Sequence, residues 1–205
     1  MQFEPNTIYH IYNQGNNRQQ IFYKEENYIY FLRKMRKQLL PHVEFLAYCL
    51  MPNHFHWLVL TKESACLPSN SLKAGHRKSS GDSKSPDDYY IQNLSNSIAI
   101  LLRSYTRAIN KQEDKSGSLF RGKTKAKNGI IDGFITVNGK NKDLFFRADN
   151  HYARVCFEYI HNNPVEAKLC LEQTDWRYSS AVDYAGLRNG SLCNQELAKK
   201  LIFGE

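Results

Sequence analysis

Residues 50–60 (LMPNHFHWLVL) carry the most informative pattern in the chain. Pro52 and Asn53 are residue types that favour turns, and the apolar and aromatic residues that follow them favour a strand. Side chains alternate between the two faces of a strand, so His54 and His56 share one face. Two imidazoles side by side are a natural pair of metal ligands. The alternative is an ordinary strand with one buried and one exposed histidine.

The residues before this segment predict two strands with a helix between them. Residues 7–13 (TIYHIYN) are rich in β-branched and aromatic types and predict a first strand. Residues 24–40 have apolar side chains at three- and four-residue spacing, which predicts an amphipathic helix that ends before Pro41. Residues 43–50 predict a second strand. The short turn that follows makes this strand an antiparallel hairpin with residues 54–61.

The residues after the hairpin alternate between low-complexity and structured segments. Residues 63–90 are rich in Ser, Lys, Gly and Asp and predict a flexible insertion. Residues 95–111 predict a second amphipathic helix. Residues 130–147 contain an Asn-Gly turn signal, and we expect one strand there to join the main sheet and the rest to form an extra β-ribbon. Residues 151–162 predict a third helix, closed at Pro164 because the residue before a proline avoids the helical conformation.

The order of these elements indicates the fold class. The first six elements match a ferredoxin-like βαββαβ sandwich of the α+β class, in which the first and third strands are central and antiparallel. An additional C-terminal helix carries Tyr159 and Asn163, which are four residues apart and therefore lie one above the other. The sequence allows this helix to cross the sheet and bring Tyr159 to the histidine pair. We interpret residues 1–205 as a single domain.

Composition and charge narrow the class of partner. The 205 residues are 41% hydrophobic and carry a formal net charge of +8. This favours a globular protein with a polyanionic partner, most simply nucleic acid, and a basic soluble protein without such a partner is the alternative that charge alone leaves open. Five cysteines without a CxxC pair argue for reduced thiols and a cytoplasmic location. We expect no membrane association, because no apolar run is long enough to span a bilayer.

Candidate nucleic-acid contacts lie in three basic stretches. Residues 116–127 (SGSLFRGKTKAK) form an extended, glycine-punctuated segment with cations beside an aromatic residue. Such a segment is typical of phosphate-backbone contacts, and a solvated basic loop is the alternative. Two arginines lie one turn apart on the second predicted helix, and another ends the polar loop at residues 15–18. The candidate DNA-binding residues are Arg18, Arg103, Arg107, Arg121, Lys123 and Lys125.

Several motifs, taken in order, resemble those of a known family. They are MPNHFH at residues 51–56, LFRG at residues 119–122 and YIHNNP at residues 159–164. Together they resemble the HUH-type single-tyrosine transposases, and in particular the REP-associated tyrosine transposases. GNNR at residues 15–18 and WRYSS at residues 176–180 also fit that branch.

The resemblance, which spans residues 9 to about 184, implies an activity and a site. The family cleaves single-stranded DNA next to hairpins through a tyrosine, leaving a 5′-phosphotyrosine intermediate and a free 3′-hydroxyl. By motif, Tyr159 is the catalytic nucleophile, and His54, His56 and Asn163 are the metal ligands. The resemblance therefore implies a metal-dependent tyrosine transposase and single-strand DNA endonuclease.

The implied chemistry agrees with these residue types. A covalent nucleophile conserves the energy of the phosphoester bond, so that the strand can be rejoined. Two imidazoles and an amide oxygen suit Mg²⁺ or Mn²⁺, although histidines also bind Zn²⁺, Ni²⁺ and Co²⁺. The implied partner is single-stranded DNA with a hairpin, and a homodimer is a candidate assembly. The sequence identifies no general base, and we interpret His161 as a structural polar residue.

Two other functions stay open at this point. A non-catalytic single-stranded nucleic-acid-binding protein of ferredoxin-like fold would also present aromatic residues and a basic loop. Such a protein needs neither the histidine pair nor Tyr159 and Asn163, so these residues favour the enzyme. A relaxase or replication initiator uses the same chemistry, but it usually carries larger domains.

Overall fold

A computed structural model of the chain describes residues 1–69, 90–128, 134–137, 140–143 and 151–205. Its centre is a four-stranded sheet in the order β2-β3-β1-β4, in which all neighbouring strands are antiparallel. The strands are β1 (Ile8–Gln14), β2 (Val43–Met51), β3 (His54–Thr61) and β4 (Lys125–Asn128). The hairpin of β2 and β3 therefore forms where the sequence predicts it.

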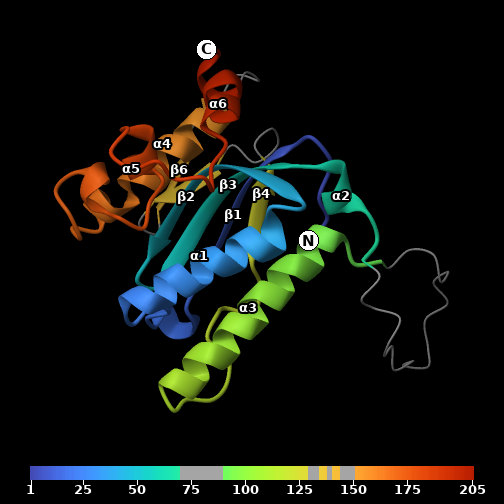
Figure 1. Ribbon diagram of the computed structural model, residues 1–205, viewed down its shortest axis with the longest axis vertical. Coiled ribbons are helices and arrows are strands. Elements are labelled where there is room, and N and C mark those ends of the chain that lie inside the picture. Colours follow the sequence, from blue (N-terminus) through green and yellow to red (C-terminus); the bar gives the residue numbers. More distant parts are fainter. Residues whose placement is uncertain (70–89, 129–133, 138–139, 144–150) are drawn as a thin grey trace.

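Helices cover both faces of this sheet (Figure 1). Helices α1 (Glu25–Leu39) and α3 (Asn93–Gln112) pack against each other over one face. Helix α4 (His151–Glu166) packs against β2 and β3 on the other face. An antiparallel sheet with helices of this kind agrees with the predicted α+β class. Shorter helical elements are η1 (Asn16–Arg18), α2 (Glu63–Cys66), η3 (Gln173–Asp175), α5 (Ala181–Tyr184), α6 (Gln195–Ala198) and η4 (Lys199–Phe203).

The turn between β2 and β3 is held by the loop that follows β1. The backbone N–H of Ile21 donates to the carbonyl of Pro52 at 2.8 Å, and the N–H of Gly15 donates to the carbonyl of Asn53 at 2.8 Å. Only glycine fits at position 15, because a Cβ there would lie 2.1 Å from the carbonyl oxygen of Gln19. The loop therefore lies directly beside the histidine-bearing end of β3.

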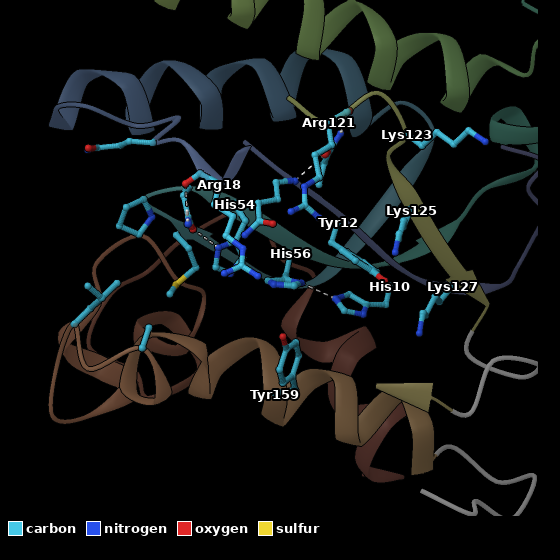
Figure 2. A pocket seen from close by; sticks show the side chains of 18 residues that line it. His10, Tyr12, Arg18, His54, His56, Arg121, Lys123, Lys125, Lys127 and Tyr159 are labelled. Atoms are coloured by element: carbon cyan, nitrogen blue, oxygen red, sulfur yellow. Dashed lines mark hydrogen bonds between the residues drawn. The ribbon is translucent and has the colours of Figure 1, made fainter. Parts of the chain in front are cut away.

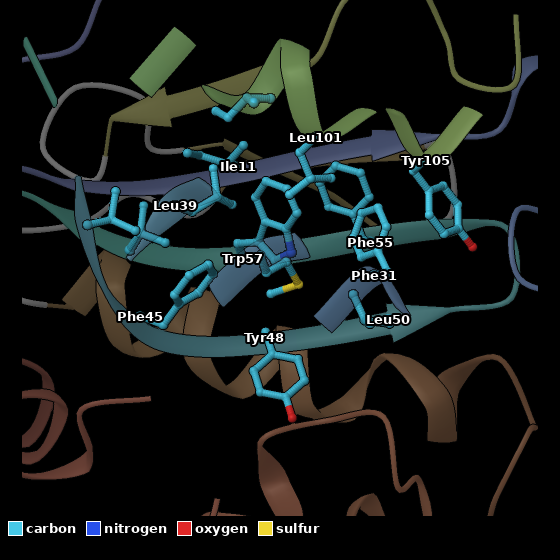
Figure 3. Close-up of a cluster of buried hydrophobic side chains, with 14 of the residues drawn as sticks. Ile11, Phe31, Leu39, Phe45, Tyr48, Leu50, Phe55, Trp57, Leu101 and Tyr105 are labelled. Carbon is cyan, nitrogen blue, oxygen red and sulfur yellow. The ribbon is translucent and has the colours of Figure 1, made fainter. Parts of the chain in front are cut away.

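The face of the sheet beneath α1 and α3 is an aromatic core (Figure 3). Phe55 and Trp57 of β3 are fully buried there, together with Phe31 of α1 and Tyr105 of α3. The ring of Phe31 lies 5.5 Å from that of Phe55 and 4.8 Å from that of Tyr105, measured between centroids. Burial of a side chain of this kind contributes about 1.5–3 kcal/mol, so this face supplies much of the free energy of folding.

The opposite face of the sheet is apolar only where α4 covers it. A β-bulge between Phe45 and Ala47 of β2 shifts the register with β3. A second core lies between α4 and the strands β2 and β3. It includes Leu46, Ala47, Cys49, Met51, Leu58, Cys156 and Ile160. Beyond it, on the β1 and β4 side, the same face carries histidine, tyrosine and lysine side chains. The functional candidates are found there.

The fourth strand of the sheet corrects one sequence prediction. We expected it within residues 130–147, but β4 comes from the basic segment at Lys125–Asn128, and Ala126 pairs with Ile11 of β1. Alternating lysines are rare in strands; here they project on one face while Ala126 packs against the aromatic core on the other. The strands β5 (Phe134–Val137) and β6 (Lys140–Asp143) pair with each other as a separate antiparallel ribbon.

The end of α4 corrects a second sequence prediction. The helix does not close at Pro164 but continues to Glu166, and the N–H of Ala167 still donates to the carbonyl of Asn163 at 3.0 Å. A proline in a helix interior costs about 3 kcal/mol. Packing offsets this cost. Ile160, one turn before the proline, and Asn163, directly before it, are both buried.

Three further expectations concern the insertion, the membrane and the cysteines. Of the insertion expected at residues 63–90, positions 70–89 lie outside the described residues, and the described remainder contains α2 and a bridge between Pro68 and Gln92. Within the described parts of the chain, no helix combines the length and apolar character needed to cross a bilayer. All five cysteines are described, and each is a free thiol.

Candidate active site and nucleic-acid interface

A cavity of about 920 Å³ opens on the polar part of the sheet, between β1, β3, β4 and α4 (Figure 2). The strand register creates it. Tyr12 of β1 pairs with His56 of β3 on one side and with Lys125 of β4 on the other, so the three side chains project from the same face. His10, two residues before Tyr12, projects from that face as well.

His54 lies between two asparagines. Its Nδ1 is 2.5 Å from Oδ1 of Asn53, and its Nε2 is 3.2 Å from Oδ1 of Asn163. The Asn53 amide donates through Nδ2 to the carbonyl of Arg18 at 3.4 Å, which orients its oxygen toward His54. Burial lowers the pKa of His54, while its contact with Asn163 acts in the opposite direction. A neutral His54 has one N–H, and the shorter contact, to Asn53, favours placing it on Nδ1.

His56 is paired with a histidine of the neighbouring strand. Its Nδ1 lies 2.9 Å from Nε2 of His10, and both rings are buried. Burial lowers the pKa of His56 well below its ordinary value, and the neighbouring His10 and His54 lower it further. Burial and the nearby Lys127 ammonium lower the pKa of His10 to about 3. Both imidazoles are therefore neutral at physiological pH, the form in which histidine binds metals.

The donor set fits a divalent cation. Nε2 of His54 and Oδ1 of Asn163 are 3.2 Å apart, and with the His54 proton on Nδ1 each of these two atoms has a lone pair that a cation could share. Two neighbouring ligands of an octahedral cation with bonds of about 2.1 Å are roughly 3 Å apart. Within the described residues, no three His, Cys, Asp or Glu side chains are placed to hold a metal. The candidate set therefore consists of His54, His56 and the amide oxygen of Asn163.

Tyr159 points from α4 toward the histidines (Figure 2). Its ring lies edge-on to those of His56 and His10, with centroid distances of 5.3 Å and 6.1 Å. Burial raises the pKa of Tyr159, and Asn163, one turn further along the helix, acts in the opposite direction. The structure thus brings close together the four residues predicted from the sequence motifs, which are His54 and His56 of β3 and Tyr159 and Asn163 of α4.

Cations line the mouth of the same cavity. They are Arg18, Arg121, Lys123, Lys125 and Lys127, and no Asp or Glu lines it among the described residues. The buried Asn13 fixes the basic segment, because its Nδ2 donates to the carbonyl of Arg121 at 3.2 Å and to Oγ1 of Thr124 at 2.9 Å. The Lys125 ammonium lies 5.9 Å from the centre of the Tyr12 ring. This arrangement provides a positive rim with an aromatic surface beside it.

The two arginines of α3 lie in a different hollow. Arg103 and Arg107 line a groove of about 800 Å³ between α3 and the 116–124 segment. Arg121 and Lys123 line both this groove and the cavity, so the two are continuous along the basic segment. In the described part of the chain this groove, too, contains no acidic side chain. The six predicted DNA-binding residues therefore follow one path across two adjoining hollows.

Sequence reasoning missed His10, Tyr12 and Lys127 of the cavity. The alternation in residues 7–13 already places His10 and Tyr12 on one face, opposite Tyr9 and Ile11. Which of these faces meets the histidine pair depends on the pairing of β1 with β3, which the sequence leaves undefined. No sequence signal marks Lys127 apart from its neighbours.

His161 lies outside the cavity. Its Nε2 is 2.7 Å from Oγ of Ser180, and that hydroxyl also accepts from the N–H of Tyr48 on β2 at 2.9 Å. Both side chains are buried. His161 thereby connects α4 to the edge of the sheet and helps to set the position of the helix that carries Tyr159, the role expected of a structural polar residue.

A search of solved structures finds a similarity to a REP-associated tyrosine transposase bound to a REP hairpin. The superposition gives a TM-score of 0.51 with 14% sequence identity, and it covers 88% of this chain and 79% of that one. The likeness is one of fold. A scan against protein-family models finds no match, and a search of curated proteins also finds none.

Proposed function

We propose that this protein is a metal-dependent tyrosine transposase that cleaves and rejoins single-stranded DNA next to hairpins. The observation that carries the proposal is the convergence of Tyr159, His54 and His56 on one cavity, with Asn163 in contact with His54. Cations line this cavity, and no described Asp or Glu does. The shared fold with a transposase that binds a DNA hairpin supports it. The strand order β2-β3-β1-β4, with α1 and α3 on one face, supports a ferredoxin-like assignment of the core.

In the proposed reaction Tyr159 attacks a phosphodiester of the DNA. A bond forms between the phenolic oxygen and phosphorus as the phenol loses its proton, the bond from phosphorus to the 3′-oxygen breaks, and that oxygen takes up a proton and leaves as a 3′-hydroxyl. The DNA stays attached to Tyr159 through its 5′-phosphate, and attack by a 3′-hydroxyl reverses the step. Because the rings of His56 and His10 lie edge-on to that of Tyr159, the tyrosine is oriented before DNA binds.

The proposed cofactor is Mg²⁺ or Mn²⁺ on His54, His56 and Asn163. A divalent cation bound there supplies Lewis-acid polarisation of a non-bridging phosphate oxygen. The chain itself contributes neutral imidazoles, a buried Asn163 and a tyrosine that is protonated at neutral pH, since burial only raises a pKa that is ordinarily near 10.

The proposed DNA path follows the basic segment. Arg18, Lys125 and the face of Tyr12 would bind the strand that enters the cavity, through phosphate contacts and stacking. Arg103 and Arg107 would bind a neighbouring stretch of the same DNA in the adjoining groove. None of these cations forms an ion pair within the described residues, so their charge is available to phosphates.

A denaturing gel with labelled, hairpin-bearing single-stranded DNA and Mn²⁺ tests the proposal. The wild type should give a covalent protein–DNA adduct, and Tyr159→Phe should give none while binding DNA as before. Tyr178→Phe is the matched control, because Tyr178 does not line the cavity and its ring stacks on that of Tyr28, with 3.7 Å between the ring centroids. This variant should form the adduct normally.

Three outcomes would contradict the mechanism. An adduct that persists in Tyr159→Phe places the nucleophile elsewhere. Nicking by the wild type without any adduct means that water attacks. Tight binding without nicking in Mg²⁺ or Mn²⁺ favours the alternative function, a non-catalytic single-stranded nucleic-acid-binding protein.

A further inference from the structure

We propose that His10 is a positioning residue that accepts a hydrogen bond from His56 and thereby frees the other nitrogen of His56 for the metal. The inference rests on the proposed function, because it concerns the same metal site. It adds a residue from β1 that lies 44 positions before the histidine pair begins. The inference is based on the buried 2.9 Å contact between Nε2 of His10 and Nδ1 of His56 (Figure 2).

Only one direction of this hydrogen bond is compatible with metal binding. A neutral imidazole has one N–H and one lone pair. If His10 donated, the proton of His56 would sit on Nε2, and neither of its nitrogens could bind a cation. If His56 donates from Nδ1, its Nε2 keeps a free lone pair. The proton of His10 then lies on its own Nδ1.

His54 shows the same arrangement with a different acceptor. Its Nδ1 faces Oδ1 of Asn53, which cannot donate, while its Nε2 faces Asn163. Each histidine of the pair thus has an outer partner at Nδ1, an amide oxygen for His54 and an imidazole for His56. Such outer partners fix the tautomer and ring orientation of metal-binding histidines, and their loss typically costs 10–100-fold in metal affinity.

The surroundings of His10 hold it in place for this role. The Tyr12 ring stacks on it with 4.9 Å between centroids, and the Tyr159 ring lies edge-on at 6.1 Å. His10 pairs with Leu58 in the β1–β3 register, next to the pair of Tyr12 with His56. The position of the His10 ring therefore depends on the pairing of the two central strands, β1 and β3.

Calorimetric titration of the metal-free protein with Mn²⁺ tests the inference. His10→Phe keeps a buried ring but removes the acceptor, and we expect Mn²⁺ affinity to fall by about 10–100-fold. His10→Gln restores an acceptor oxygen and should recover most of the lost affinity. His42→Phe is the matched control, since it removes a histidine near the far end of β2, and it should bind Mn²⁺ as the wild type does.

The tautomers of the wild type give a second test that needs no variant. Nitrogen-15 NMR of the histidine side chains should show the protons of His56 and His10 on Nδ1, with and without Mg²⁺. A proton on Nε2 of His56 overturns the inference, as does wild-type Mn²⁺ affinity in His10→Phe. The tyrosine adduct is measured separately on the denaturing gel, so an adduct formed by the wild type together with either of these results means that the inference fails while the proposed reaction stands.

Discussion

On β3, Phe55 and Trp57 point into the core beneath α1 and α3, whereas His54 and His56 point into the cavity beside α4. The two pairs alternate along one strand, so their surroundings differ although their backbone is shared. Two helices, α1 and α3, pack over the first face. On the second face, within the described residues, α4 packs on β2 and β3, and the cavity lies on the β1 and β4 side.

One sheet thus combines a stable core on one face with a polar surface, which carries the candidate active site, on the other. Each aromatic ring on the covered face contributes to folding and needs no polar partner. The histidines on the other face lose water from their ring nitrogens and need polar partners, and Asn53 and Asn163 contact His54 while His10 contacts His56. Stability should therefore depend mainly on the first face, and chemistry on the second.

The largest expected effect on stability comes from Phe55→Ala. This change removes a fully buried ring between Phe31 and Trp57, and we expect the free energy of unfolding to fall by about 3–5 kcal/mol. Urea unfolding followed by circular dichroism measures it. Cleavage per folded molecule should stay near the wild-type rate; a selective loss of cleavage would mean that the two faces are not separable.

His54→Ala, one residue earlier, should have the opposite profile. The protein should fold, because this side chain is only partly buried and lies at the cavity. Metal-dependent cleavage should fall by at least about a hundredfold, since a first ligand is lost. The assay is nicking of hairpin DNA across a Mn²⁺ titration. If the variant nicks normally, His54 is not a ligand.

The next effect is a change in the salt dependence of DNA binding. Substituting Arg121, Lys123 and Lys125 together by alanine should lower the slope of log affinity against log salt by about 2, because each phosphate contact to a single strand contributes roughly 0.7. Fluorescence anisotropy between about 50 and 200 mM salt measures the slope. An unchanged slope would exclude the basic segment as the phosphate site.

A matched control removes the same charge from the covered side of the sheet. Its three substitutions to alanine are at Arg33, Lys34 and Lys37 of α1. The slope for this variant should equal that of the wild type. A fall of similar size in both variants would mean that net charge, and not a specific path, governs binding.

The smallest expected effect is a loss of stability in mild acid. His10 is neutral in the fold with a pKa of about 3, whereas an unfolded histidine titrates near 6.5. The unfolded state therefore binds more protons, and the free energy of unfolding falls as pH drops below the unfolded value. Between about pH 7 and pH 6 one such histidine contributes roughly 0.7 kcal/mol.

Comparison of the wild type with His10→Phe isolates this contribution. Urea unfolding in a metal chelator at both pH values should show that the variant loses roughly 0.7 kcal/mol less than the wild type. Equal losses in the two proteins would mean that His10 is already accessible to protons in the folded state.

Much of the local structure follows from the sequence. The apolar periodicity of residues 24–40 and 95–111 predicts α1 and α3 closely, and the Pro-Asn turn predicts the hairpin of β2 and β3. The i, i+2 spacing puts His54 and His56 on one face, and the i, i+4 spacing puts Asn163 one turn after Tyr159. These results depend on repeats within single elements, which a sequence displays directly.

Contacts between elements that are far apart in the chain depend on how the whole chain packs. This packing recruits Lys125–Asn128 as the edge strand, carries α4 past Pro164, and pairs β1 with β3 so that His10 reaches His56. These outcomes depend on register and on burial between segments far apart in the chain, whose free energy outweighs local preferences for loops or helix ends. Tyr159 faces the histidines for that reason, because the packing of α4 on β2 and β3 sets its distance from them.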